Sequence, residues 1–368
     1  MINSDRLVKT FCDIVKIDSI SGEEDDIAKD LTSRLEKLGL TVESDDYGNL
    51  IANSDNFEPE FESPPILLSI HMDTVDPGRG IKPKIEDGII KSDGTTIIGG
   101  DAKAGVAAVL EAIESIHEDK VEHLPYQVCL TREEETGLHG ARNLDFSKIY
   151  AKEAIVFDGE GPVNTVTVAA PTYIGFTIEI TGRAAHAGVE PEKGLSAIRI
   201  AAELITRMPQ GRLDEDTTFN IGLIEGGSVR NTVPEDAKII GEFRSQNIET
   251  IDNIGLEIKD IISRVQIMYP EAELKEHLHT EFEHYEFGDK DPTYIRVAEA
   301  MKKMNLTPSM KSSGGGTDGN IFRLKGITSV VVGMADNGMH TVREHVKIDE
   351  LTDAAQFCEI VLKRTHQD

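Results

Sequence analysis

Tryptophan is absent from the 368-residue sequence and aromatic residues make up only 5% of it, so its cores must rest mainly on Ile, Val, Leu and Ala. Basic residues are also outnumbered, because 38 Lys and Arg stand against 66 Asp and Glu, for a formal net charge of −28. Nucleic acids and anionic membrane surfaces both bind to basic surfaces, so this balance argues against both kinds of partner. We expect most of the acidic charge to lie on a solvated surface.

Cysteines and long apolar runs are scarce as well. The three cysteines are far apart and odd in number, which disfavours both a disulfide framework and a close-spaced thiolate metal site (Cys12, Cys129 and Cys358). We therefore expect a reduced, cytoplasmic compartment. Residues 1–15 lack the basic region followed by an apolar block that marks a signal peptide. No apolar run approaches the roughly 18 residues that a membrane span requires.

The order of periodic segments predicts an α/β fold with an insertion. Apolar runs of strand length lie at 66–70, 126–132, 154–157 and 329–334. They alternate with segments of helical periodicity, which predicts a mixed, mostly parallel sheet with helices on both faces. Between them the pattern changes to alternating strands and two helices, typical of an α+β unit. We therefore predict a main domain formed by residues 1–167 and 284–368, interrupted by an inserted domain at 168–283.

The two ends of the chain are predicted to be helical. Residues from about Ser4 to Leu38 show two helical patterns, and Ser21 is expected to be the N-cap of the second helix. A final helix is expected near Glu350–Arg364.

A histidine and an aspartate follow the first of the apolar runs. His71 and Asp73 stand two positions apart, and such residues of a strand point to the same side. Asp73 can therefore accept a hydrogen bond from the imidazole and fix its tautomer, as partners of metal-bound histidines do. Taken alone, the pair is more typical of a strand-end histidine that makes an ordinary loop hydrogen bond.

Further acids and a histidine follow the other strands. They are Glu134 and Glu135 after 126–132, Asp158 after 154–157, and His340 soon after 329–334, while Asp101 opens a helix within 99–105. Each alone is also typical of an acidic loop, a turn or a helix cap. Because the carboxyl ends of parallel strands meet at one edge of a sheet, we expect these side chains to converge there.

The chemistry of this set points to metal ions. Two histidines with several carboxylates and no thiolate suit Zn²⁺, Co²⁺ or Mn²⁺. Five ligands are too many for one catalytic zinc that keeps an open position. They fit two metal ions that share one carboxylate, an arrangement used by aminopeptidases.

The motifs, taken in order, resemble those of the two-zinc exopeptidases and deacylases, the family of peptidase T, carnosinase, acetylornithine deacetylase and succinyl-diaminopimelate desuccinylase. The matching segments span nearly the whole chain: HMDTV at 71–75, GGDAKAGVA at 99–107, EETG at 134–137, FDGE at 157–160, GRAAHAG at 182–188, GGSVRNTVP at 226–234, GGGTDGN at 314–320 and MHTVRE at 339–344. The FDGE and GGTDG segments make the sequence most similar to peptidase T.

This resemblance implies a role for each candidate in the main domain, which is then the catalytic domain. Asp101 bridges two divalent ions, expected to be Zn²⁺ with Co²⁺ or Mn²⁺ as alternatives. His71 and Asp158 complete one ion's site, whereas Glu135 and His340 complete the other. Glu134 is the general base that deprotonates the water between the ions, and Asp73 orients His71.

The resemblance also implies roles for the inserted domain, which acts as a lid and dimerisation domain in the family. His186 matches a histidine that stabilises the tetrahedral oxyanion, often across a dimer. Asn231 and Arg244 match substrate contacts, and Arg244 could bind a substrate carboxylate through two hydrogen bonds. Without the resemblance, His186 is also typical of a turn, Asn231 of a polar cap, and Arg244 of a surface ion pair.

Two positions depart from the family pattern or compete with it. Ala102 stands where the family commonly has a second acid after the bridging aspartate, so the local backbone or the tuning of the site is expected to differ. His345 is a rival to His340. We prefer His340 because it stands four positions before Glu344, as in the family pattern.

The resemblance predicts a tripeptide aminopeptidase that acts on short peptides. A related amidohydrolase (a carboxypeptidase, a dipeptidase or an N-acyl amino-acid deacylase) is the alternative, because the same catalytic core serves all of these. An inactive peptide-binding relative would be expected to have lost the base or a ligand, whereas Glu134 and the five ligand candidates are all present. We also expect a homodimer through the inserted domain, since the open edge of its sheet invites pairing.

Overall fold

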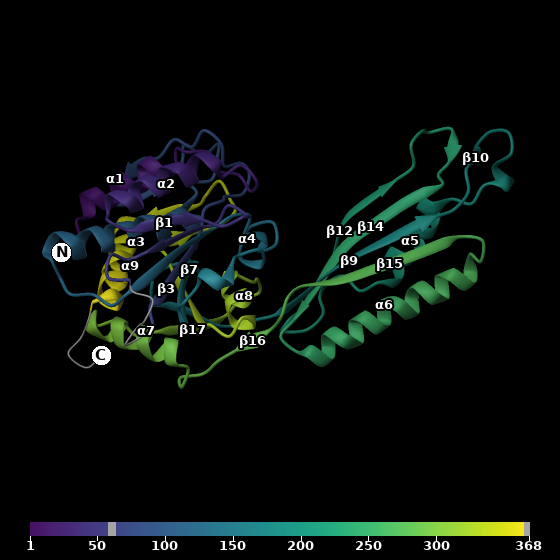
Figure 1. Ribbon diagram of the computed structural model, residues 1–368. Helices are drawn as coiled ribbons and strands as arrows, with labels where there is room; N and C mark the ends of the chain where they lie inside the picture. The colour runs from purple at the N-terminus through teal and green to yellow at the C-terminus, as the bar shows by residue number, and fades with distance from the viewer. Residues whose placement is uncertain (58–63, 364–368) are drawn as a thin grey trace. The chain divides into compact units, whose positions relative to one another are not determined.

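The computed structural model describes residues 1–57 and 64–363, and the chain divides into two compact units (Figure 1). The main unit contains the chain up to Val168, Glu286–Ser312 and the chain from Thr317 onward. The inserted unit contains Ala169–Tyr285 and also Ser313–Gly316. The predicted mixed, mostly parallel sheet with helices and a separate inserted domain is confirmed.

The main unit is built on one large sheet in which the strands follow the order β1-β2-β6-β3-β7-β18-β8-β16, with β17 paired to β8. These strands are β1 (Thr41–Ser44), β2 (Leu50–Asn53), β3 (Ile66–His71), β6 (Tyr126–Thr131), β7 (Glu153–Gly159), β8 (Thr165–Ala170), β16 (Tyr285–Glu286), β17 (Ser309–Ser312) and β18 (Thr328–Gly333). The neighbours β6, β3, β7 and β18 run parallel, so their carboxyl ends lie at the same edge.

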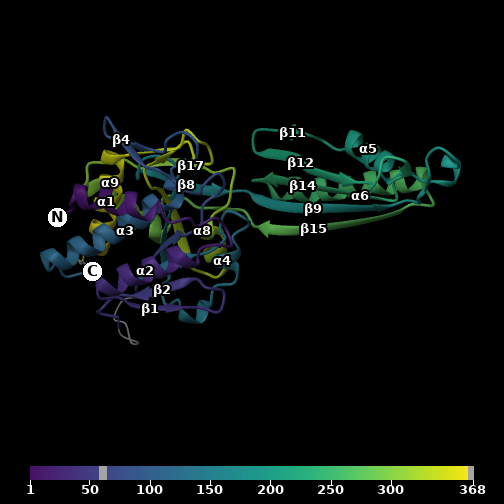
Figure 2. The ribbon, with the colours of Figure 1, turned by 90° about the horizontal axis from the view of Figure 1, so that it is seen from above.

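Both faces of this sheet are covered by helices (Figure 2). The helices of the unit are α1 (Ser4–Ile14), α2 (Asp25–Lys37), α3 (Gly100–Asp119), α4 (His139–Arg142), α7 (Pro292–Lys303), α8 (Asp318–Leu324) and α9 (Ile348–Leu362), with the 3-10 turn η1 (Phe146–Lys148). Leu68 and Ile70 of β3 join a core cluster that includes residues of α1, α3 and α9, whereas Leu67 joins a cluster with Phe322 of α8. Two-sided burial explains why the central strands read as unbroken apolar runs.

A second, small sheet contacts α3 near the start of that helix. It follows the order β19-β20-β5-β4 and consists of β4 (Lys84–Glu86), β5 (Ile89–Lys91), β19 (Asp336–Asn337) and β20 (His345–Lys347). Val346 of β20 and Ile90 of β5 pair with each other and are both buried. The loop between β19 and β20 is thereby fixed at both ends, and this loop carries His340.

The predicted N-cap of the second helix is wrong. The helix α2 begins at Asp25 with Glu24 at its N-cap position, and Ser21 lies outside it. The Ser21 hydroxyl instead donates a hydrogen bond to the Asp73 carboxylate at 2.7 Å. A local capping rule failed because a distant, buried carboxylate competes for the same hydroxyl. The final helix is α9, and Arg364, where we expected it to end, lies outside the described residues.

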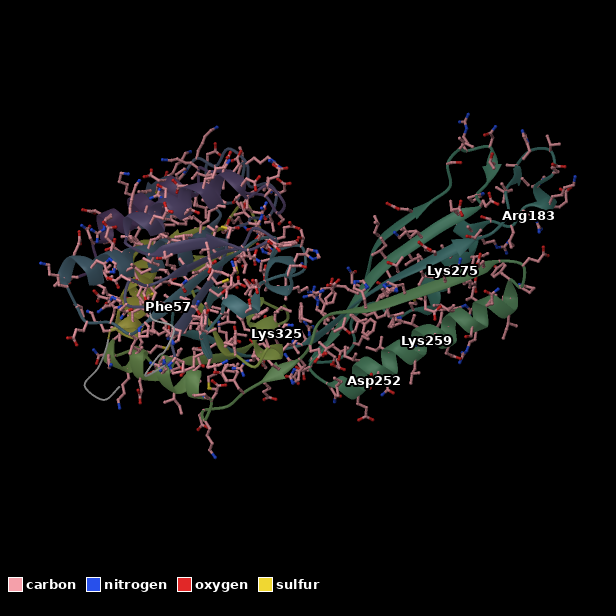
Figure 3. The ribbon with its side chains drawn as sticks, in the orientation of Figure 1. Phe57, Arg183, Asp252, Lys259, Lys275 and Lys325 are labelled. Atoms are coloured by element: carbon pink, nitrogen blue, oxygen red, sulfur yellow. The ribbon has the colours of Figure 1, made fainter. Side chains whose placement is uncertain are left out.

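The inserted unit is an antiparallel sheet with two helices. Its sheet follows the order β11-β12-β14-β9-β15, and the elements are β9 (Thr172–Thr181), β10 (Ala185–His186), η2 (Pro191–Lys193), α5 (Ala197–Arg207), β11 (Gly211–Arg212), β12 (Thr217–Gly226), β13 (Thr232–Val233), β14 (Asp236–Ser245), α6 (Ile248–Met268) and β15 (Glu273–Phe282). Three of the scarce aromatic residues, Phe176, Phe219 and Phe243, pack together in its core. Charged side chains such as Asp252 and Lys259 project outward from α6 (Figure 3).

Two further observations concern the state of the cysteines and the apolar character of the helices. Cys12, Cys129 and Cys358 are all free thiols, and the last two are buried. Among the described residues, no helix combines the length and the apolar character needed to cross a membrane.

Candidate metal centre

The parallel strands and the loops that follow them bring the predicted ligands together. His71 is the last residue of β3, Asp158 lies near the end of β7, and Asp101 lies in the first turn of α3. Glu135 follows β6, and His340 lies in the loop between β19 and β20. Ligand atoms of these residues, with Glu134, form overlapping groups of three whose members all lie within 4.8 Å of one another.

The Asp101 carboxylate lies at the centre of the cluster. Its Oδ1 atom is 3.0 Å from His71 Nε2, and its Oδ2 atom is 3.2 Å from His340 Nε2. The two oxygens of one carboxylate therefore face two different histidines. Asp158 Oδ1 lies 3.4 Å from His71 Nε2, and Glu135 Oε2 lies 3.0 Å from His340 Nε2. The cluster thus consists of two half-sites that share Asp101.

Burial makes this cluster electrostatically demanding without bound cations. Burial lowers the pKa of His71, but hydrogen bonds to Asp101, Asp158 and Asp73 outweigh it and raise that pKa well above its usual value. Hydrogen bonds to Asp101 and Glu135 raise the pKa of His340 to about 10. Burial raises the pKa of Asp158 to about 8, although His71 opposes the shift.

The same donor set fits divalent metal ions. Protons on the two histidines provide the positive charge that the clustered carboxylates require, and cations would provide it in their place. Imidazole nitrogens and carboxylate oxygens, with no thiolate in the cluster, are ligands for Zn²⁺, Co²⁺ or Mn²⁺. The residues present therefore fit the two ions that the sequence predicts.

Glu134 lies within the cluster, directly before Glu135. Its side chain shares one of the groups of ligand atoms with His71 and Glu135, and the residue is 8% exposed. Burial raises the pKa of Glu134 well above its usual value, and the nearby Asp158 carboxylate raises it further. A carboxylate with a raised pKa is a stronger base, as a group that takes a proton from water needs to be.

Asp73 is completely buried and forms hydrogen bonds to several parts of the cluster. Its carboxylate accepts hydrogen bonds from the backbone N–H groups of Glu134 at 3.0 Å and Glu135 at 3.2 Å. His71 Nδ1 lies 3.0 Å from the backbone carbonyl of Asp73 and 3.4 Å from its carboxylate. The nearer acceptor for the imidazole is therefore the carbonyl, whereas the sequence predicted the carboxylate. One residue fixes both His71 and the loop that carries Glu134.

Glu344 is a buried residue whose part in the site the sequence did not reveal. Its carboxylate accepts hydrogen bonds from four consecutive backbone N–H groups, those of Ile98, Gly99, Gly100 and Asp101, at 2.8 to 3.2 Å. It therefore ties the loop that carries His340 to the loop that presents Asp101. The only available sequence signal was its place in the MHTVRE motif.

The glycine before Asp101 is required by close packing. A Cβ atom at Gly100 would lie 2.2 Å from Asp336 Oδ1 and 2.9 Å from a methyl group of Val346. Burial raises the pKa of Asp336 well above its usual value, and the neighbouring Glu344 and Asp101 carboxylates raise it further. The peptide bond between Asp101 and Ala102 is cis, and Ala102 is buried where a second acid was expected from the family pattern.

Two further buried ionisable groups support the cluster. The Lys103 ammonium donates a hydrogen bond to the Ile17 carbonyl at 2.8 Å, and burial lowers its pKa to about 8. The Asp318 carboxylate accepts a hydrogen bond from Thr131 at 2.5 Å, and burial raises its pKa to about 6. Lys103 lies in the motif at 99–107 and Asp318 in the motif at 314–320, but the sequence alone indicated no role for either residue.

His345 is less well placed than its rival. It lies on β20, its Nδ1 atom is 3.1 Å from the Arg343 carbonyl, and within the described chain it belongs to none of the groups of metal-ligand type. The geometry therefore favours His340, as the sequence analysis did.

In the inserted unit, the candidate residues do not all lie together. His186 of β10 pairs in register with Thr232, and the Ala187 N–H donates to the Asn231 carbonyl at 3.0 Å. Both His186 and Asn231 are exposed. Arg244 lies near the other end of the sheet, on β14, so the structure brings His186 and Asn231 together but leaves Arg244 apart from them.

Arg244 already has partners of its own. Its guanidinium lies 4.2 Å from the centre of the Tyr173 ring, donates to Glu242 at 2.8 Å, and donates to the Gly314 carbonyl at 3.1 Å. The Nε atom is buried and has no hydrogen-bond partner among the described residues. The guanidinium is thus anchored by three contacts, and its buried Nε atom is not exposed to a ligand.

Comparisons with known proteins agree with this geometry. Residues 168–269 match the peptidase dimerisation domain of the M20 family. The uncharacterised protein YqjE of Bacillus subtilis is 37% identical over 99% of both chains. The solved aminopeptidase PepT of Bacillus cereus is 37% identical over 98% of both chains with a TM-score of 0.84, and a solved tripeptidase of Staphylococcus aureus is 35% identical over 98% of both chains with a TM-score of 0.88. The chain belongs to the M20 family of metallopeptidases, as the motifs predicted, and it is a peptide hydrolase.

Proposed function

We propose that the chain is a two-metal aminopeptidase that releases the N-terminal residue of tripeptides. The observation that carries the two-metal proposal is the Asp101 carboxylate, whose two oxygens face His71 and His340 separately. Similarity over the whole chain to an aminopeptidase and a tripeptidase favours short peptides as substrates.

Each half-site would hold one divalent ion. His71 and Asp158 would hold one ion, Glu135 and His340 would hold the other, and Asp101 would contribute to both. Bound there, the two ions would lower the pKa of a water molecule and polarise the scissile carbonyl. We expect Zn²⁺, with Co²⁺ or Mn²⁺ as alternatives.

Glu134 is the proposed general base. Its buried carboxylate takes a proton from the attacking water and can return it to the amine that leaves, so the side chain ends the cycle unchanged. Burial raises the pKa of Glu134, which makes its carboxylate a stronger base than an exposed glutamate. Asp73 keeps this carboxylate in place through the backbone N–H of Glu134.

The inserted unit is proposed to form a homodimer and to complete the site. Beyond Phe219, the outer edge of β12 has no strand partner among the described residues, and Leu223 and Ile224 on it are 46% and 50% exposed. An unpaired, partly apolar edge is a surface suited to pairing with a second copy. His186 would stabilise the oxyanion, and Asn231 and Arg244 would bind the peptide.

The dimer proposal has its own test. We expect light scattering at micromolar concentration to give twice the mass of the chain, and Ile224→Glu on the exposed edge to shift the protein toward the monomer. Ile267→Glu, at an 80% exposed position on α6, is the matched control and should leave the mass unchanged. A monomeric wild-type protein would overturn the proposal and would require His186 to act within its own chain.

The free thiols bear on where the enzyme works. None of the three cysteines forms a disulfide in the described part of the chain. Chains that keep several reduced thiols are typical of reducing compartments, which supports the proposal that the enzyme acts in the cytoplasm.

The substrate proposal is tested with blocked peptides. Unmodified, N-acetylated and C-amidated tripeptides and N-acetyl amino acids are incubated with the enzyme, with Zn²⁺ or Co²⁺ and again with a chelator. We expect metal-dependent release of the N-terminal residue that acetylation blocks and that Glu134→Ala abolishes. Turnover of the acetylated substrates would instead show a carboxypeptidase or a deacylase with the same centre. Bound metal without turnover of any substrate would show an inactive peptide-binding relative.

A further inference from the structure

The main unit contains a second cluster of side chains of metal-ligand type, away from the residues assigned to catalysis. It consists of His117 in the last turn of α3, His123 in the segment before β6, and Asp55 in the turn after β2. One ligand atom from each lies within 4.8 Å of the other two. Phe57, which is labelled in Figure 3, lies two residues beyond Asp55.

His123 is oriented as metal-bound histidines are. Its Nδ1 atom lies 2.9 Å from the Leu124 carbonyl, and because a carbonyl can only accept, this nitrogen must carry the proton. In a neutral imidazole the lone pair is then on Nε2, which lies 3.3 Å from Asp55 Oδ1. A lone pair and a carboxylate oxygen at that distance repel each other unless a proton or a cation lies between them.

A proton between His123 and Asp55 would leave the third residue unexplained. His117 Nε2 is buried and has no hydrogen-bond partner in the described part of the chain. Buried polar atoms of this kind are rare, because each loses its hydrogen bonds to water without replacement. A cation bound by all three side chains would satisfy the set as a whole.

The spacing of His123 and Asp55 suits a first-row transition metal. Bonds of roughly 2.0–2.1 Å to nitrogen and oxygen place two ligands of a tetrahedral ion about 3.4 Å apart, close to the 3.3 Å between His123 and Asp55. The His123 side chain is 10% exposed and that of Asp55 is 58% exposed, so an ion could enter from the side of Asp55. Two imidazoles and one carboxylate favour Zn²⁺ or a similar ion over Mg²⁺ or Ca²⁺.

We propose that Asp55, His117 and His123 form a second, non-catalytic site for a transition-metal ion such as Zn²⁺. Its effect would be on stability. The helix α3 carries Asp101 at its start and His117 near its end, and His123 comes just before β6, which leads to Glu134. An ion at this site would therefore join the far ends of two elements that carry the catalytic centre, and would hold the folded state by mass action.

The test counts metal ions on the full-length protein after equilibration with Zn²⁺. Wild type and His123→Asn are compared, with His277→Asn, an exposed histidine on β15, as the matched control. We expect one ion fewer per chain in His123→Asn than in wild type, and no change in the control. The same difference of one ion is expected when Asp101→Asn is added to both the wild-type and the His123→Asn protein, so it does not depend on the catalytic centre.

A second variant covers the case in which His123→Asn fails to fold. Asp55→Asn changes a mostly exposed side chain and should fold normally. We expect its Zn²⁺ affinity at this site to fall by more than the roughly 10–100-fold lost when only an outer partner of a ligand is removed. We also expect the Zn²⁺-induced rise in the melting temperature to shrink in Asp55→Asn. Equal metal content and equal thermal response in wild type and both variants would overturn the proposal.

Discussion

The main unit and the inserted unit present their candidate residues in very different ways. In the main unit, His71 and Asp101 are buried, and His71 Nε2 lies 3.0 Å from Asp101 and 3.4 Å from Asp158. In the inserted unit, His186 and Asn231 are exposed. The first set is assembled by the fold of a single unit, whereas the His186 imidazole accepts one local hydrogen bond, from the Gly188 N–H, on an exposed surface.

This difference follows from how each site is built. Parallel strands force their carboxyl ends to one edge, so the fold itself brings the ligands of the main unit together. Exposed residues on a small antiparallel ladder have no such constraint, so their side chains are free to bind a substrate or a second copy. Chemistry that needs fixed distances is therefore expected in the main unit, and contributions that depend on binding are expected from the inserted unit.

The largest effect is expected from Glu134→Gln. Loss of a general base typically costs about 10²–10⁴-fold, and here it should lower kcat with little change in KM or in metal content. Steady-state kinetics on a tripeptide and metal analysis provide the measurement. Glu133→Gln is the matched control and should retain most of the activity. Equal activity in Glu134→Gln and wild type would show that Glu134 is not the general base.

His186→Ala is expected to lower kcat by about 10²–10³-fold, which is typical for the loss of one donor to an oxyanion. Mixing the chains sharpens the comparison between the units. If His186 acts in the site of a partner, heterodimers of His186→Ala and Glu134→Gln contain one intact site and should recover activity. If activity does not recover in verified heterodimers, His186 serves its own chain or has no part in the reaction.

A smaller effect, of about 10–100-fold in metal affinity, is expected from Glu344→Gln. The glutamine amide would place N–H groups against backbone N–H groups where the carboxylate accepts four hydrogen bonds. Titration with Zn²⁺ measures the loss, and saturating metal should restore much of the activity. Glu350→Gln, which removes a surface ion pair with Lys347, is the control and should bind metal normally.

The smallest effect is a change in how stability depends on pH. Folding raises the pKa of His340 from 6.5 to about 10 and that of Asp158 from 3.8 to about 8. In both cases the folded state holds a proton that the unfolded state has lost, so each group makes the metal-free protein less stable as pH rises, Asp158 between 3.8 and about 8 and His340 between 6.5 and about 10. Bound metal replaces these protons and should flatten the slope.

Urea unfolding of chelator-treated and Zn²⁺-loaded protein at several pH values measures this slope. His340→Gln should make this slope shallower between pH 6.5 and about 10, where the unfolded histidine has lost its proton and the folded histidine keeps it. A metal-free protein that becomes more stable as pH rises through this range would contradict the assigned charge states.

Much of the main unit's site could be predicted from the sequence because its signals are local. His71, Asp158 and Glu135 each follow an apolar run, and the parallel strands bring these residues to the same edge of the sheet. Contacts between distant segments could not be predicted in this way. Nothing near Glu344 in sequence shows that it accepts hydrogen bonds from the loop that carries Asp101.

Other misses have the same origin. Ser21 satisfies the local rule for a helix N-cap, yet it donates to Asp73 instead. The cluster of Asp55, His117 and His123 has no regular spacing, and only the meeting of three segments reveals it. Sequence patterns thus predicted what each element presents, whereas the contacts between elements had to come from the structure.

We propose that Asp101 bridges two metal ions. The most direct test is a crystal structure of the Zn²⁺-loaded protein with anomalous scattering at the zinc edge. We predict two anomalous peaks, each next to one oxygen of Asp101, with His71 and Asp158 at one peak and Glu135 and His340 at the other. A single peak in this cluster, or peaks that Asp101 does not bridge, would contradict the account.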